Sequence, residues 1–393
     1  MDRTINDREI CAEVAAEAYI FLYPLVLMDI TRRVSRVKNP VNSFQHMKEF
    51  PPPTYREVVK PNFDTLYSVA WLDISTEPQV ISVPDTGDRY YVLPMYDMYT
   101  DVFASPGQRT TGSRAGNFVV TLTHWNGDLP PGTIRINSSS KYVWVIGRIQ
   151  TSGTPEDLAA VHELQSAMSI QSLPQYMSTK NAQPSESCNA HTVDMDTSAM
   201  DMDTSAVDVD TPPMQQVDNM DAVFFFQYAM ALLRSHPPHV SDWSVLQRMS
   251  RYLHLPVDND RPCLVDFSDR VIDALTAGMA SAKEHLMAPH ALQSASRMVN
   301  GWSIFTHSLG VYGNNYMLRA KIALIGLGAL PPTESVYPEA LQDADGDLLH
   351  AQHGYHIHFD KDELPPANAF WSITLYDDDN FPIPNEAGVI AYV

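Results

Sequence analysis

The hydrophobic pattern at the start of the chain predicts one amphipathic helix. Five apolar residues recur at helical spacing and share one face: Val14, Ala18, Phe21, Leu25 and Met28. Glu17 and Pro24 interrupt the apolar run, and acidic residues outnumber basic ones before it. A secretory signal begins with positive charge, and a membrane helix needs roughly 20 apolar residues in a row. We therefore expect a cytoplasmic protein with neither a signal peptide nor a membrane span.

Short strand-like runs follow the first helix. Segments rich in Val, Tyr, Phe and Trp occupy residues 66–74, 89–96, 118–123 and 142–149. Turn sequences such as Pro84-Asp85-Thr86-Gly87 separate them. Short strands with Gly/Pro turns and no helices between them predict an antiparallel sandwich or barrel.

Helical patterns dominate the middle of the chain, and strand-like patterns return near its end. Thr154-Pro155-Glu156-Asp157 predicts an N-cap and a helix to about residue 170. Further helices are predicted at 224–234, 268–287 and 315–330, and strands at 355–359 and 370–376.

The charge distribution identifies one segment of a different kind. The 393 residues carry a formal charge of −21, and nine acids but no Lys or Arg occur between residues 181 and 233. Three seven-residue copies of the type Val-Asp-Met-Asp-Thr-Ser-Ala fill residues 193–213. Alternating aspartates favour solvated backbone over a coiled coil, and the Gly and Glu of an EF-hand loop are missing. We expect a disordered acidic insert rather than a calcium site.

Composition also excludes several classes of function. Nucleic acids and anionic lipids require Lys/Arg patches, so we expect no nucleic-acid partner and no membrane partner. The three cysteines are too few and too widely spaced for a disulfide framework or a zinc site. The chain contains no nucleophile elbow, Walker loop, dinucleotide fingerprint or HExxH motif.

Several phrases of the sequence resemble a known pair of domains. In the first half these phrases are 61–68, 83–91, 96–100 and 110–112. In the second half they are 301–302, 310–320, 326–328, 336–338, 343–346, 355–359 and 364–377. They resemble proteins that carry two domains of unknown function, DUF1254 and then DUF1214. The resemblance implies jelly-roll-like sandwiches with helices between them, often assembled as oligomers, and it implies no particular reaction.

Patterns and resemblance together predict a fold class. We expect an α+β, mainly β protein in which two antiparallel jelly-roll-like sandwiches are joined by a helical middle region. The expected parts are a helix and link (1–60), the first sandwich (61–150), a helix (151–171), the insert (172–222), a helical region (223–330) and the second sandwich (331–393).

Two departures from the family pattern concern the insert and the end of the chain. The acidic repeat is not part of the pattern, and relatives look set to continue beyond Val393 through another β-segment. We therefore expect the second sandwich to lack strands and to leave an edge for a partner or loop. A shortened gene product or gene model explains the same ending.

The first group of candidate site residues lies in the predicted first sandwich. A carboxylate, a guanidinium and tyrosine hydroxyls could orient a small polar substrate or transfer protons. These candidate catalytic residues are Asn62, Asp64, Tyr67, Arg89, Tyr91, Asp97 and Tyr99. A structural ion pair with tyrosine hydrogen bonds explains the same residues.

The other candidates lie in the second half. His356 and His358 would share one face of a strand and could hold a metal, or they could be surface histidines. The cofactor is unknown, and spacing does not favour a divalent metal. Tyr316, Arg319 and Tyr376 are candidate substrate-binding residues, with an internal salt bridge as the alternative for Arg319.

Three functions remain open from the sequence. The first is an enzyme of hydrolase, lyase or isomerase type that acts on a small organic metabolite in a pocket of the first sandwich. The second is a non-catalytic carbohydrate- or metabolite-binding module. The third is a self-assembling structural or interaction protein, and we expect a homo-oligomer. A fold does not decide among them, because unrelated functions share folds.

Overall fold

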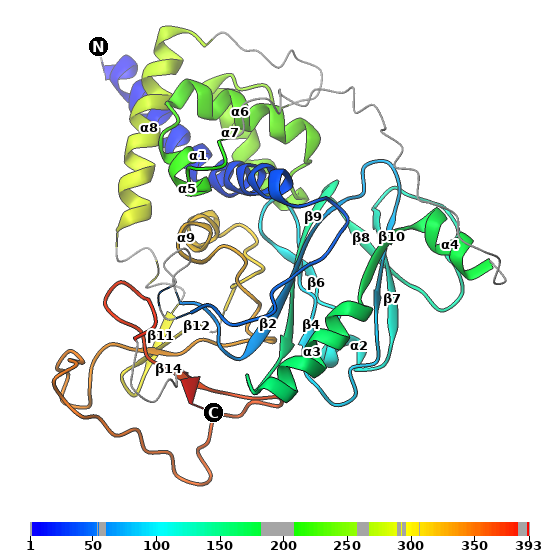
Figure 1. The fold of residues 1–393 in the computed structure, drawn as a ribbon. Helices are drawn as coiled ribbons and strands as arrows, with labels where there is room; N and C mark the ends of the chain where they lie inside the picture. The colour runs from blue at the N-terminus through cyan, green and yellow to red at the C-terminus, as the bar shows by residue number, and fades with distance from the viewer. Residues whose placement is uncertain are drawn as a thin grey trace.

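The computed structural model of the chain has three parts: a helical lobe, a β-sandwich and a C-terminal region of mostly extended chain (Figure 1). It describes residues 2–52, 54, 60–181, 208–257, 267–288, 292, 296–305, 307–383 and 391–392. Helix accounts for 37% and strand for 20%, so the α+β class is confirmed and the mainly β expectation is wrong.

Helix α1 (Asp2–Lys38) is the core of the helical lobe, and it continues through Pro24. Every residue from 18 to 30 is buried, so the helix is buried on all sides and has no polar face there. Five other helices contact it: α5 (Pro213–Asp218), α6 (Ala222–Ser235), α7 (Trp243–Leu253), α8 (Asp269–Met287) and α9 (Tyr316–Gly326). These surrounding helices explain why helix outweighs strand in this chain.

The length of α1 corrects one expectation. By length and composition, Asp7–Lys38 could cross a membrane. We expected an apolar segment too short and too interrupted to do so. However, 72% of its most apolar window is buried inside the protein. A core helix and a signal sequence near the N-terminus share this composition, and the packing here is that of a core helix.

The predicted helices form close to their expected positions. α3 (Pro155–Ala167) begins where Thr154 accepts a hydrogen bond from the Asp157 N–H, and α6, α8 and α9 cover the other three segments. Two helices, α4 (Leu173–Asn181) and α5, lie inside the range expected to be disordered. Asp221, one of the nine acids, caps α6 through the Phe224 N–H at 2.8 Å. Most of the acidic repeat lies in 182–207, outside the described residues.

The β-sandwich consists of two sheets that face each other (Figure 1). The first has the order β1 (Gln45–His46), β2 (Thr65–Asp73), β9 (Tyr142–Gln150), β5 (Met95–Tyr96) and β6 (Val102–Ala104), with β4 (Tyr91–Val92) also paired to β9. The second has the order β10 (Ser169–Ser172), β3 (Gln79–Val83), β7 (Gly116–Leu122) and β8 (Ile134–Ser138). Leu72 and Val145 from one sheet share a core with Ile81 and Phe118 from the other.

Two details of this sandwich differ from expectation. β7 and β8 pair in parallel, whereas we expected only antiparallel pairs. The single strand predicted at 89–96 is two short strands, β4 and β5, with Pro94 between them. Proline cannot donate a ladder hydrogen bond, so the run breaks at that point.

The C-terminal region contains little regular structure. β11 (Ser296–Val299), β12 (Trp302–Phe305) and β13 (Glu339–Ala340) form a small sheet, and β14 (Ile373–Thr374) pairs with β15 (Ala391–Tyr392). The strand predicted at 355–359 is absent, and the one at 370–376 is reduced to β14. Alternating apolar residues favour a strand when a facing layer buries them. Within the described part of 331–383, no large apolar side chain is fully buried.

Candidate functional site

A group of polar residues lies at the seam between the β-sandwich and the C-terminal region. The hydroxyl of Ser372 donates to Asp64 Oδ2 at 2.8 Å, and the Tyr376 hydroxyl donates to the Pro61 carbonyl at 2.9 Å. Arg148 Nη1 donates to the Tyr337 hydroxyl at 2.9 Å. We call Asp64, Tyr67, Arg148, Tyr337, Ser372 and Tyr376 the seam cluster.

Strand register positions the sandwich half of this cluster. Tyr67 on β2 is the cross-strand partner of Arg148 on β9, and the guanidinium carbon lies 5.3 Å from the centre of the Tyr67 ring. Val145 and Ile149 point into the sandwich core, so Arg148 points to the opposite face. Just before β2, the side-chain oxygen of Asn62 accepts the Asp64 N–H at 2.7 Å and fixes the turn that presents Asp64.

Further contacts hold the two parts together around the cluster. Lys60 pairs with Glu339 at 2.6 Å on one side. On the other side, Glu334 accepts a hydrogen bond from the Tyr90 hydroxyl at 3.0 Å and pairs with Arg109 at 2.6 Å. The seam is therefore held by contacts independent of the cluster.

The protonation equilibria of the cluster are shifted in opposite directions. Burial raises the pKa of the Asp64 carboxyl, against the hydrogen bond from Ser372. Burial also raises the pKa of Tyr376, to about 12. Tyr337 is 49% exposed, and the guanidinium of Arg148 brings its pKa below the ordinary value, against its partial desolvation. A carboxyl that holds its proton more tightly and a phenol that holds it less tightly are suited to exchange protons with a ligand.

A second polar cluster lies between the sandwich and the helical lobe. His239 Nε2 meets Asp97 Oδ2 at 2.6 Å, and His239 Nδ1 lies 3.4 Å from Asp101 Oδ2. Arg319 Nη2 donates to Asp101 Oδ2 at 3.0 Å, and the Tyr316 hydroxyl donates to Asp242 Oδ1 at 3.0 Å. We call Asp97, Asp101, His239, Asp242, Tyr316 and Arg319 the His239 cluster.

The electrostatics of the His239 cluster favour a charged imidazole. The hydrogen bond to Asp97 raises the pKa of His239, and burial opposes this shift. Burial raises the pKa of Asp101, against the positive charge of Arg319. The cluster therefore places Arg319 and His239, whose charged form is favoured, among the side chains of three aspartates.

Three side chains of this cluster are close enough together to be candidate metal ligands. Donor atoms of Asp97, Asp101 and His239 all lie within 4.8 Å of one another. However, Asp97 and Asp101 face opposite nitrogens of the same imidazole, and Arg319 already binds Asp101. One metal ion can use only one of those nitrogens, so the geometry fits an ion-pair network better than a metal centre.

The structure separates the candidates that the sequence grouped together. Asn62, Asp64 and Tyr67 lie at the seam, whereas Asp97 and Tyr99 lie at the His239 cluster. The Tyr99 hydroxyl donates to the His236 carbonyl at 2.8 Å.

Arg89 and Tyr91 hold other parts of the sandwich. Arg89 pairs with Asp157 at 2.5 Å, which lowers the pKa of that carboxyl, and the Tyr91 hydroxyl donates to the Gly112 carbonyl at 3.2 Å. The single site expected in the first sandwich is therefore not assembled, because its residues lie on different faces.

The substrate-binding and metal candidates also separate. Tyr376 joins the seam cluster, while Arg319 forms the internal salt bridge that was its alternative. His356 and His358 are exposed and lie outside any strand, so the shared strand face does not exist. His358 contacts Asp360 at 3.0 Å.

Sequence reasoning missed Arg148 and Tyr337 at the seam, and Asp101, His239 and Asp242 in the second cluster. One usable signal was a lone arginine within the apolar run 142–149, since a charge in a buried strand requires a partner. Another was Tyr337 within a phrase of the family resemblance. His239 carries no comparable signal.

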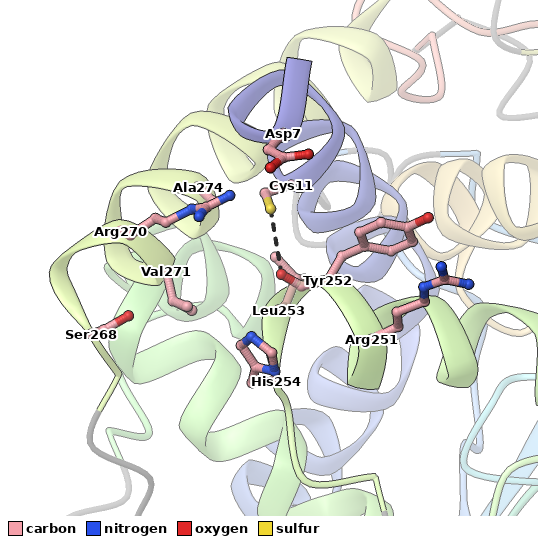
Figure 2. A pocket seen from close by; sticks show the side chains of 10 residues that line it. All are labelled: Asp7, Cys11, Arg251, Tyr252, Leu253, His254, Ser268, Arg270, Val271 and Ala274. Carbon is pink, nitrogen blue, oxygen red and sulfur yellow. Dashed lines mark hydrogen bonds between the residues drawn. The ribbon is translucent and has the colours of Figure 1, made fainter. Parts of the chain in front are cut away.

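Two cavities border α1 rather than the sandwich, where we expected a pocket. One of about 260 Å³ lies between α1, α7 and α8 (Figure 2). There the Cys11 thiol donates to the Tyr252 carbonyl at 3.4 Å, Arg270 extends toward Asp7, and Arg251 points away. The other, an open groove of about 430 Å³, includes Glu13, Glu17, His285 and Tyr316.

Comparison with solved structures supports the overall fold. The VPA0106 protein from Vibrio parahaemolyticus is similar with a TM-score of 0.67 and 20% sequence identity, over 97% of this chain and 83% of that chain. Identity at this level establishes the fold alone. A search of curated proteins finds no match.

Family models match the chain in two places. The family model DUF1254 matches residues 41–172, and the family model DUF1214 matches residues 334–392. Each describes a protein of unknown function. Asp64, Tyr67 and Arg148 fall in the first match, and Tyr337, Ser372 and Tyr376 in the second. The seam cluster therefore joins the two matched regions, and the chain carries a DUF1254 match followed by a DUF1214 match, the tandem order expected from the sequence.

Proposed function

We propose that this protein is an enzyme that acts on a small organic molecule by proton transfer, with the seam cluster as its active site. The observation that carries the proposal is the convergence of a carboxyl, a guanidinium and tyrosine hydroxyls from both matched regions on one seam. The pKa directions of Asp64 and Tyr337 add to it, because they bring the proton affinities of the carboxyl and the phenol closer together.

The roles follow from the chemistry of each side chain. Asp64, protonated more readily than an ordinary aspartic acid, is the general acid, and Tyr337, deprotonated more readily than an ordinary phenol, is the general base. Ser372 positions Asp64 through its hydrogen bond. Ser372 donates to a carboxylate and contacts no described histidine or lysine, so isomerase or lyase chemistry fits better than a serine hydrolase.

Hydrogen exchange tests the proposal even before a substrate is identified. Purified protein is incubated in D₂O with a panel of small metabolites, and deuterium incorporation and product formation are followed by NMR. We expect Asp64→Asn to lower the rate on any responsive compound by about 100-fold or more. Asp378→Asn, the same change at an exposed aspartate near the seam, is the matched control and keeps the wild-type rate.

Two outcomes would redirect the proposal. Equal rates for Asp64→Asn and wild type would remove Asp64 from the active site. Saturable binding of a compound without exchange or turnover would instead identify a non-catalytic binding module.

Assembly of copies is a second proposed role, and it has its own observation. The C-terminal region exposes large apolar side chains, among them Leu341, Leu348, Ile357, Leu364 and Leu375. A contiguous exposed apolar patch marks an interaction site in a soluble protein, and we propose that these side chains supply one. We expect light scattering after size exclusion to give more than one copy, and a monomer at all concentrations would rule this role out.

A further inference from the structure

Within the part of the chain that the structure describes, Arg148 lacks a carboxylate partner of the kind that Arg32, Arg89 and Arg319 each have. Arg32 pairs with Asp29 at 2.7 Å, Arg89 with Asp157 at 2.5 Å and Arg319 with Asp101 at 3.0 Å. Among the described residues, no carboxylate lies within 4.0 Å of Arg148. Tyr337 is the one hydrogen-bond acceptor of its side chain among the described residues. A partly buried guanidinium that lacks a carboxylate partner favours an anionic partner from outside the chain.

Arg148 has an unused N–H group, as Arg32 and Arg319 also do, but it is the one of these three without a carboxylate partner among the described residues. Its Nη1 donates to Tyr337, but its buried Nε N–H has no hydrogen-bond partner in the described part of the chain. The Tyr67 ring lies at cation–π distance, with its centre 5.3 Å from the guanidinium carbon. A guanidinium held by Tyr67 and Tyr337, with an N–H still unused, favours a planar anionic acceptor.

From these contacts we infer that the ligand of the seam cluster carries a carboxylate group, bound by Arg148. The inference rests on the proposed function for the identity of the site, and it adds the chemical class of the ligand. A planar carboxylate matches the guanidinium edge through two parallel hydrogen bonds. Whenever Asp64 at the same seam is ionised, it repels a dianion such as phosphate more strongly than a monoanion, because repulsion grows with ligand charge.

Binding measurements with matched probes test this inference. Acetate, benzoate and succinate are titrated into the full chain by calorimetry, alongside acetamide, benzamide and succinamide. We expect each carboxylate to bind about tenfold more tightly than its amide, because the amide has the same size but no charge.

Variants of Arg148 assign the effect to one side chain. Arg148→Met is expected to weaken carboxylate binding about tenfold or more, and Arg148→Lys less than that, because lysine keeps the charge but loses the planar fork. Arg114→Met is the matched control, since Arg114 is an exposed arginine of the same sandwich. Should Arg148→Met fail to fold, Arg148→Lys and the Nε–H resonance of Arg148 remain as readouts.

NMR gives a direct signature of the contact. The Arg148 Nε–H resonance, assigned by its loss in Arg148→Lys, is expected to shift on addition of a carboxylate and not of the amide. Equal affinity for carboxylates and amides, no saturable carboxylate binding, or unchanged affinity in Arg148→Met would each overturn the inference. Preference for inorganic phosphate would replace the carboxylate with a phosphate ligand.

The outcome is separable from that of the proposed enzyme activity. Carboxylate binding through Arg148 without exchange or turnover supports this inference and removes the enzyme. Turnover of an uncharged compound that depends on Asp64 but not on Arg148 supports the enzyme and removes this inference.

Discussion

Arg319 and Arg148 lie in two polar clusters that differ in how the charge of the arginine is paired. Arg319 is fully buried, but it binds the carboxylate of Asp101, which also lies near His239. Arg148 is less buried, yet it has only a tyrosine hydroxyl and an aromatic ring among the described residues. A cluster whose charges are paired internally supports the fold, whereas one with an unpaired charge is suited to an external ligand.

The largest effect on this comparison should come from removing each guanidinium. Arg319→Met leaves Asp101 buried without its cation, and we expect it to lower the free energy of unfolding by roughly 3–5 kcal/mol in urea titrations. Arg148→Met removes a charge that has no carboxylate partner, so we expect a change within about 1 kcal/mol. Similar losses for the two variants would show that Arg148 is structural.

The next effect concerns the proton on His239. Its pKa is raised by Asp97, so its contribution to stability is full below its ordinary pKa of 6.5 and is lost as the pH rises through the raised value. We expect His239→Gln to cost roughly 1.5–3 kcal/mol at about pH 5 and less at about pH 9, measured by urea unfolding.

A matched control uses the exposed histidine of the C-terminal region. The His358 side chain is 84% exposed, so His358→Gln should follow wild type at every pH. If the stability difference between His239→Gln and wild type does not change with pH, the protonation of His239 does not cause it.

Asp64→Asn should change the free energy of unfolding less than His239→Gln does, and in the opposite direction. Because burial raises its pKa, its protonated form is favoured by the fold, and its stabilising contribution is present below its ordinary value of 3.8 and lost as the pH rises through the raised one. Asp64→Asn should therefore be as stable as wild type near neutral pH, or more stable by up to about 1 kcal/mol. A large loss of stability in thermal melts would place Asp64 among the structural groups.

The smallest expected effect is at the exposed apolar surface. Leu348 is 71% exposed, so Leu348→Gln should change the unfolding free energy by no more than about 0.5 kcal/mol. If copies assemble through this region, the same substitution shifts the association equilibrium seen by light scattering. A marked drop in monomer stability would contradict the exposed placement.

The parts of the fold that were predictable from sequence are those with local causes. Thr154 marks the start of α3 because a hydroxyl accepts an N–H of the first turn, and runs rich in Val, Tyr and Trp predicted β2 and β9. The strand predictions at 355–359 and 370–376 were wrong or too long, because apolar alternation yields a strand only when another layer covers it. The same limit applies to α1, whose apolar residues indicated one buried face while neighbouring helices bury them all.

The site was predictable only in part, for the same reason. Asp64, Tyr67 and Tyr376 were identified by residue type, but their relation to Arg148 and Tyr337 depends on distant segments. Arg148 meets Tyr337 across 189 positions of sequence, and His239 meets Asp97 across 142. Such pairings follow from strand register and domain packing, which residue spacing does not encode.

The burial of α1 has a consequence for how the chain acquires its structure. This helix comes before the helices that cover it, and the first of those begins at Pro213. Its apolar surface therefore stays uncovered until about half of the chain has been synthesised. This dependence on long-range contacts slows folding and leaves the new helix prone to aggregation. Efficient production should depend on chaperones that shield α1 until α8 arrives.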